Sequence, residues 1–175
     1  DVGNSWRPGT RFGPREIRNY STRYSGWGGS QQKGYWDINQ NKRFLEDISM
    51  SDCGDVDVAY YDIERNRKII TQTVKKILKA GTFPVVIGGD HSITYPCICA
   101  FEDFKSLDII QIDAHLDWID EVDGIRYANG SPMRRSMELD FTNKMVQLGI
   151  RCIRSRESDY HFAKSQGSQI FTRQD

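Results

Sequence analysis

Two short motifs combine histidine with aspartate in a pattern that is typical of a metal site. The first is Gly88-Gly89-Asp90-His91-Ser92, and the second is Asp113-Ala114-His115-Leu116-Asp117. The chain has only 3 histidines, and two of them lie in these motifs. Imidazole and carboxylate groups together suit a divalent cation such as Mn²⁺, Ni²⁺, Co²⁺ or Zn²⁺. The expected metal ligands are His91, Asp113, His115 and Asp117.

The second motif also has an interpretation without a metal. Asp113 and Asp117 would then cap a helix, and His115 would be a hydrogen-bonded histidine of the core. For an isolated Asp-x-His-x-Asp pattern, the two interpretations carry equal weight. A second Asp-His motif at the end of another expected strand favours the metal site.

Each motif directly follows an apolar run that is typical of a buried strand. Residues 83–87 precede the first motif, and residues 107–112 precede the second. In an open parallel sheet, ligands bind beyond the carboxyl ends of the strands. If the extended backbone continues after the second run, its two-residue period turns Asp113, His115 and Asp117 to one side.

The remaining periodicity predicts strands that alternate with helices. The expected strands lie at residues 56–60, 83–87, 107–112, 145–150 and 169–172. The expected helices lie at residues 14–21, 69–78, 92–101 (kinked near Pro96) and 156–166. Residues 24–38 are expected to form a long surface loop. This order predicts one α/β domain over residues 1–175, in which helices cover a parallel sheet.

Composition limits the classes of function. The chain of 175 residues is 38% hydrophobic and 27% charged, as in a soluble globular protein. Its 24 basic and 24 acidic residues balance, so nucleic acid and membrane surfaces are not expected partners. No apolar run is long enough to span a bilayer, and no signal peptide is visible, so we expect a cytoplasmic protein. The cysteines are expected to be buried free thiols: Cys53, Cys97, Cys99 and Cys152.

The paired motifs resemble the first two signature motifs of the ureohydrolases, the family of arginase, agmatinase and guanidinobutyrase. The segments Arg7-Pro8-Gly9-Thr10-Arg11-Phe12-Gly13-Pro14, Gly54-Asp55-Val56 and Gly149-Ile150-Arg151 resemble further parts of agmatinase-type members. The resemblance implies a three-layer α/β/α fold with a mostly parallel sheet, which is incomplete in this chain. Because family members are commonly oligomers, we also expect a homo-oligomer.

The resemblance further implies two divalent ions, most often Mn²⁺ and in some members Ni²⁺. His91, Asp113 and Asp117 would bind one ion, and His115 the other, with Asp113 bridging both. A hydroxide held between the ions would attack a small cationic guanidino compound and release urea and an amine. Asp117 is therefore also a candidate catalytic residue. Trp118, beside it, either stacks on the guanidinium group as a substrate-binding residue or packs in the core.

One departure from the family concerns the completeness of the metal site. The family adds a third motif of alternating aspartates after a later strand, and its members extend beyond both ends of this sequence. We therefore expect the chain to be part of a longer protein and these 175 residues to be inactive alone. The alternative is a non-catalytic or regulatory relative.

A second departure is Asn129, which stands where arginases and agmatinases typically have a histidine before the glycine. An amide forms hydrogen bonds but does not act as an acid or base near neutral pH. Asn129 is thus a candidate catalytic and substrate-binding residue that favours less usual substrates, including guanidine, over arginine and agmatine. Alternatively, Asn129-Gly130 is only a turn.

Overall fold

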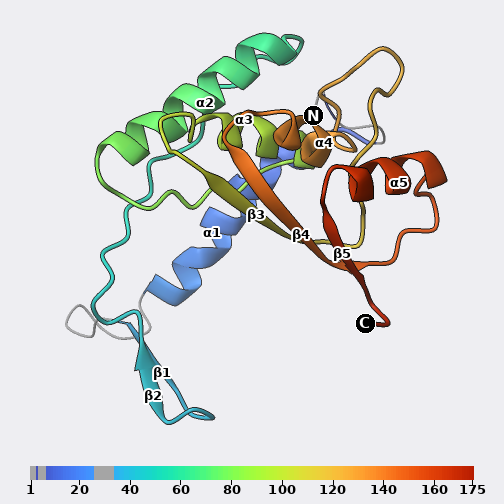
Figure 1. Ribbon diagram of the computed structural model, residues 1–175. Coiled ribbons are helices and arrows are strands. Elements are labelled where there is room, and N and C mark those ends of the chain that lie inside the picture. The colour runs from blue at the N-terminus through green and yellow to red at the C-terminus, as the bar shows by residue number, and fades with distance from the viewer. Residues whose placement is uncertain (1–2, 4–6, 26–33) are drawn as a thin grey trace. The chain divides into compact units, whose positions relative to one another are not determined.

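Figure 1 shows a computed structural model of the chain, which describes residue 3, residues 7–25 and residues 34–175. The chain divides into two compact units. The larger comprises Asp1–Arg11 and Val56–Asp175, and the smaller comprises Phe12–Asp55. The expected single domain over residues 1–175 stays a prediction.

The smaller unit consists of a helix and a β-hairpin. After the 3-10 turn η1 (Thr10–Phe12), helix α1 (Gly13–Ser25) has Pro14 in its first turn, as expected. Strand β1 (Tyr35–Asp37) pairs antiparallel with β2 (Lys42–Phe44). The predicted loop over residues 24–38 lies partly outside the described residues, and its last part is wrong. Those residues form β1 because β2 supplies the hydrogen-bonded partner that a strand needs.

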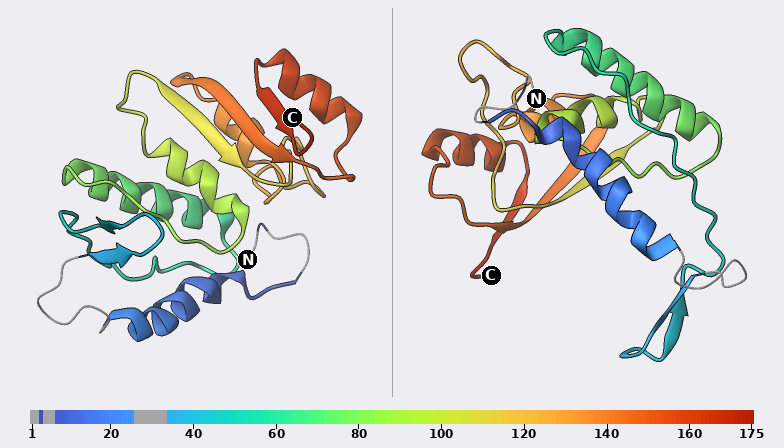
Figure 2. Two further views of the ribbon diagram at one scale, coloured as in Figure 1. Left: turned by 90° about the horizontal axis from the view of Figure 1, so that it is seen from below. Right: turned by 180° about the vertical axis from the view of Figure 1, so that it is seen from behind.

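The larger unit is built on a parallel sheet of three strands in the order β3-β4-β5. The strands are β3 (Leu107–Ile112), β4 (Thr142–Ile150) and β5 (Gln169–Thr172). Helix α4 (Pro132–Met137) lies between β3 and β4 in the sequence, and α5 (Glu157–Ser165) lies between β4 and β5. Figure 2 shows the three strands side by side in two further views. The predicted parallel α/β sheet is therefore confirmed at these strands.

The predicted helices are also present. Helix α2 (Ile63–Lys79) begins at Asp62, whose side chain accepts the backbone N–H of Arg65, and Gly81 follows its end with a φ of 70°. The helix expected near Pro96 consists of a 3-10 turn, η2 (His91–Ile93), followed by α3 (Thr94–Cys99). None of the helices in the described parts of the chain is long and apolar enough to cross a membrane.

Two predicted strands, at residues 56–60 and 83–87, are wrong. Neither segment is paired with another strand among the described residues, and Phe83 is 89% exposed. Apolar, β-branched residues favour an extended strand only where a neighbouring strand completes the hydrogen bonds and a layer covers the side chains. Local sequence could not show that these two segments lack that neighbour here.

The core of the larger unit lies on one face of the sheet. Its buried residues come from β4, from helices α4 and α5 and from the loop after β3: Leu116, Trp118, Met133, Met145, Ile150 and Ala163. On the opposite face of β3, Ile110 and Ile112 are 70% and 82% exposed. In the part of the chain that the structure describes, helices α4 and α5 thus pack on one face of an incomplete three-layer fold.

Candidate metal centre

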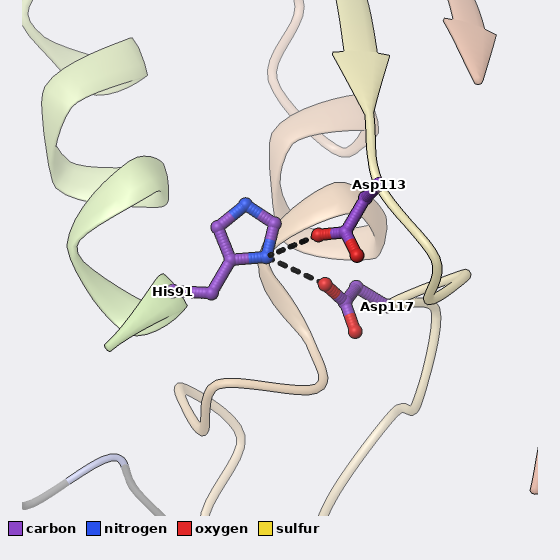
Figure 3. A group of neighbouring side chains, drawn as sticks. All are labelled: His91, Asp113 and Asp117. Carbon is purple, nitrogen blue, oxygen red and sulfur yellow. Dashed lines mark hydrogen bonds and ion pairs between the residues drawn. The ribbon is translucent and has the colours of Figure 1, made fainter. Parts of the chain in front are cut away.

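His91, Asp113 and Asp117 converge at the carboxyl end of β3 (Figure 3). One ligand atom of each residue lies within 4.8 Å of the others. The Nδ1 atom of His91 is 2.5 Å from Oδ2 of Asp117 and 3.8 Å from Oδ2 of Asp113. The structure therefore brings together three of the four residues expected to bind metal.

The backbone around the first motif orients His91. Asp90, immediately before it, caps η2 and accepts the backbone N–H of Ser92 at 2.9 Å. Gly88 leaves space for Ile93, because a Cβ atom there would lie 1.7 Å from Cδ1 of Ile93 and would force that side chain to move. The motif therefore turns sharply into the 3-10 turn, and the imidazole points toward the end of β3.

The convergence of the second motif does not come from an extended strand, so that expectation is wrong. Strand β3 ends at Ile112, and the chain bends at Ala114 and His115. Asp117 then has a φ of 57°, in the left-handed region that aspartate tolerates better than most residues. Its carbonyl oxygen accepts the backbone N–H of Met133 at 3.2 Å. A bend and a left-handed residue, rather than strand alternation, aim Asp117 at His91.

His115 lies outside the group of three but beside Asp113. Its Nδ1 atom is 3.1 Å from Oδ1 of Asp113, and its backbone N–H donates to the same oxygen at 2.8 Å. The side chain of His115 is 55% exposed. The two oxygens of Asp113 therefore face different histidines, Oδ1 toward His115 and Oδ2 toward His91.

The charges of the site influence one another strongly. Burial alone would lower the pKa of His91, but the hydrogen bond to Asp117 and the charges of Asp117, Asp113 and Asp90 outweigh it and raise this pKa. Burial alone would raise the pKa of Asp113, but the backbone N–H of His115 and the nearby imidazoles outweigh it and lower this pKa. The carboxylate is thus kept ionised, as a metal ligand must be.

Trp118 lies in the core and not on an open pocket wall. It is 1% exposed, its ring packs edge-on against Phe162, and its indole N–H donates to Oε1 of Gln147 at 2.9 Å. Of the two expectations for this residue, the structure favours core packing.

Asn129 lies in a tight turn before α4. Asn129 and Gly130 are the central residues of the turn, which the N–H of Ser131 closes onto the carbonyl of Ala128 at 3.1 Å. The N–H of Asn129 donates to the carbonyl of Gly3 at 2.8 Å. The turn that we considered is therefore present, while a role for the Asn129 amide in the site stays a prediction.

Sequence reasoning missed two buried glutamines next to the second motif. Gln111 is 6% exposed and Gln147 is fully buried, and they are partners in the register of β3 and β4. Gln111 Nε2 lies 3.5 Å from Oδ2 of Asp113. The available signal was a polar residue inside an otherwise apolar strand, because buried amides require hydrogen-bond partners.

The chain belongs to the arginase family: residues 1–175 match the family described as “Arginase family”. This membership agrees with the parallel α/β sheet and with the position of both motifs at the site. The ureohydrolase resemblance predicted from the two motifs is therefore confirmed.

Individual relatives match all or nearly all of this chain, and the match spans only about half of their own length. The Homo sapiens protein named “Guanidino acid hydrolase, mitochondrial” is 32% identical over 178 residues, which is 100% of this chain and 48% of that protein. “Agmatinase” from Bacillus subtilis is 32% identical over 95% of this chain and 53% of its own length. The crystal structure of formimidoylglutamase from Bacillus subtilis has a TM-score of 0.79 at 27% identity and covers 98% of this chain and 52% of that one. The chain thus spans about half the length of the curated relatives it matches.

Proposed function

We propose that the protein containing this chain is a metal-dependent amidinohydrolase, which cleaves a guanidino compound to urea and an amine or ammonia. The observation that carries the proposal is the convergence of His91, Asp113 and Asp117 at the carboxyl end of β3. The names of two relatives, guanidino acid hydrolase and agmatinase, support a guanidino compound as the substrate class.

The donor atoms suit two divalent cations. One imidazole and two carboxylates within 4.8 Å of one another form an incomplete shell for one ion. Asp113 turns its other oxygen toward His115, so these two residues would be available to hold a second ion. We assign His91, Asp113 and Asp117 to the first ion and His115 to the second. Mn²⁺ is our first choice and Ni²⁺ our second, since both accept mixed nitrogen and oxygen ligands.

The side chains of the site have separate roles in this proposal. Bound metal ions supply hydroxide near neutral pH. The carboxylates of Asp113 and Asp117 balance the charge of the ions and favour a cationic guanidinium group in the site. Asn129 offers hydrogen bonds to substrate but no proton near neutral pH, so we expect the leaving group to be protonated by another group. Agmatine, a guanidino acid and guanidine are the candidate substrates.

The remaining partners of the protein stay predictions. We expect a homo-oligomer in the cytoplasm that binds neither nucleic acid nor membranes. The balance of 24 basic and 24 acidic residues supports the part of this expectation that concerns nucleic acid and membranes, because no net charge attracts polyanions.

The test is urea release by the whole protein, loaded with Mn²⁺ or Ni²⁺, from arginine, agmatine, guanidinobutyrate, guanidinopropionate and guanidine. We expect turnover of one compound. His91→Ala and Asp113→Ala should reduce it by more than the roughly 10–100-fold that is typical for outer-shell partners of a metal. His161→Ala is the matched control, because the side chain of His161 is 67% exposed on α5. Two bound ions without urea release from any compound would instead support a non-catalytic relative.

A further inference from the structure

A chain of buried hydrogen bonds lies beneath the second motif, outside the expected ligand set. Gln147 lies at its centre in β4 and bonds four neighbours. Its Oε1 accepts Trp118 Nε1–H at 2.9 Å and the hydroxyl of Ser168 at 2.8 Å. Its Nε2 donates to the carbonyl oxygen of Leu116 at 2.8 Å and to Oε1 of Gln111.

The chemistry of the neighbours determines which way each amide points. An indole N–H only donates, so the atom of Gln147 that faces Trp118 must be the oxygen. The backbone carbonyl of Leu116 only accepts, so the opposite atom must be the nitrogen. The contacts of Oε1 and the contacts of Nε2 therefore each determine the orientation of the Gln147 amide, and the two results agree.

The same orientation continues into Gln111. Because Gln147 presents a donor, Gln111 must present its oxygen there, and its own nitrogen then faces the second motif. That nitrogen lies 3.5 Å from Oδ2 of Asp113 and 3.4 Å from the carbonyl oxygen of His115, and both atoms accept hydrogen bonds. A donor is therefore directed from the core toward the Asp113 oxygen that faces His91.

We propose that Gln111 and Gln147 are positioning residues, which hold the bend after β3 so that Asp113 and Asp117 face His91 in the arrangement that binds metal. This inference rests on the proposed metal centre. Backbone hydrogen bonds already tie Asp113, Ala114 and Asp117 to neighbouring segments. The two glutamines add side-chain hydrogen bonds to Leu116, His115 and Asp113 within the bend. In the core, another path for the bend would leave amide groups without partners, so the network selects one path.

The network predicts that substitutions at Gln111 and at Ser168 have different effects on metal binding. Gln111→Met removes the link between Gln147 and Asp113 and leaves Gln147 Nε2 bonded to Leu116. Ser168→Ala also removes one bond to Gln147 and leaves Oε1 bonded to Trp118. Each variant removes one hydrogen bond of Gln147, but Gln111→Met also removes the bonds from Gln111 to Asp113 and to the carbonyl of His115. Only Gln111 therefore leads to an expected metal ligand.

The experiment is a titration of each metal-free, full-length variant with Co²⁺, followed by its visible absorption, which reports both affinity and coordination geometry. We expect Gln111→Met to bind Co²⁺ about 10–100-fold more weakly than the wild type, with an altered spectrum. We expect Ser168→Ala to keep the wild-type affinity within about twofold, because it leaves the link to Asp113 intact. Melting temperatures of the metal-free proteins show whether the two variants are destabilised alike.

Gln111→Asn provides a second variant if Gln111→Met does not fold. It keeps an amide but is one methylene too short to reach both Gln147 and Asp113, so we expect the same weakening. Wild-type Co²⁺ affinity and spectrum in a folded Gln111 variant, or equal weakening in Ser168→Ala, would overturn the positioning role. Failure of the wild type to bind Co²⁺ would reject the metal centre itself, which is a different result.

Discussion

The Nδ1 atom of His91 lies 2.5 Å from Oδ2 of Asp117, although the two residues are 26 positions apart along the chain. The histidine belongs to the 3-10 turn η2, and the aspartate follows the bend after β3. This pair, with Asp113, brings an imidazole nitrogen and two carboxylates to one point, where either a proton on His91 or a metal ion would be stabilised. At the proposed metal centre, protons and metal ions would therefore compete for the same atoms.

The pH dependence of stability should have opposite signs with and without metal. Nearby carboxylates raise the pKa of His91 above its ordinary 6.5, so protonated His91 stabilises the metal-free protein below pH 6.5. That stabilisation is lost as the pH rises through the raised pKa. Metal requires the deprotonated imidazole, so metal affinity should fall about tenfold per pH unit below the same pKa. Melting temperatures between about pH 6 and 8, with Mn²⁺ and with a chelator, test both signs. Parallel pH profiles in the two series would contradict this assignment.

Asp117 should have a backbone role that is separable from its charge. Asp117→Asn keeps a residue type that tolerates a φ of 57° and loses the carboxylate, so metal affinity should fall with little loss of fold stability. Asp117→Val loses both the carboxylate and the tolerance of a left-handed backbone. It should cost a further ~1–2 kcal/mol in the free energy of unfolding. Urea denaturation and Mn²⁺ binding of the two variants separate the effects. Equal stability of the Asp117→Asn and Asp117→Val proteins would show that the left-handed conformation is not maintained.

Any cost of replacing Gly88 should come from its contact with Ile93 and not from the metal. A Cβ atom at Gly88 would meet Cδ1 of Ile93 at 1.7 Å, so Gly88→Ala should destabilise the protein by about 1–3 kcal/mol. Ile93→Val removes that Cδ1 atom, and the double variant should recover much of the loss. Thermal unfolding of the two single variants and the double variant gives the coupling free energy. Additive losses would mean that the clash is relieved elsewhere.

The cysteines should differ in reactivity, which corrects one expectation from sequence. All four are free, but none is fully buried: Cys53 is exposed, and Cys97, Cys99 and Cys152 are partly buried. Burial, aided by the neighbouring Cys99, raises the pKa of Cys97 to about 12. At pH 8, iodoacetamide should therefore modify Cys53 and leave Cys97 intact, because the thiolate is the reactive form. Peptide mass spectrometry measures the modification of Cys53 and of Cys97, with a sample unfolded in guanidinium as the control. Rapid labelling of native Cys97 would show that its helix opens readily.

Local patterns in the sequence were sufficient for much of the scaffold. Leu107–Ile112 and Gln169–Thr172 are strands with the predicted bounds, and α2 and α5 lie where helical periodicity placed them. These elements are recognisable from the spacing of apolar residues within each segment alone. The strand predicted at residues 83–87 depends on a neighbour, and the same apolar pattern was therefore not enough.

The site divides in the same way. The sequence by itself determined the family and the candidate ligands, because His91, Asp113 and Asp117 stand in motifs whose chemistry is readable without coordinates. Only the tertiary structure decided how those ligands meet: through a bend and a left-handed Asp117, and not through strand alternation. It also decided that Trp118 belongs to the core and that Gln111 and Gln147 lie beneath the site. Such assignments depend on hydrogen bonds between residues far apart in the chain, such as the 29 positions between Trp118 and Gln147, which no local pattern records.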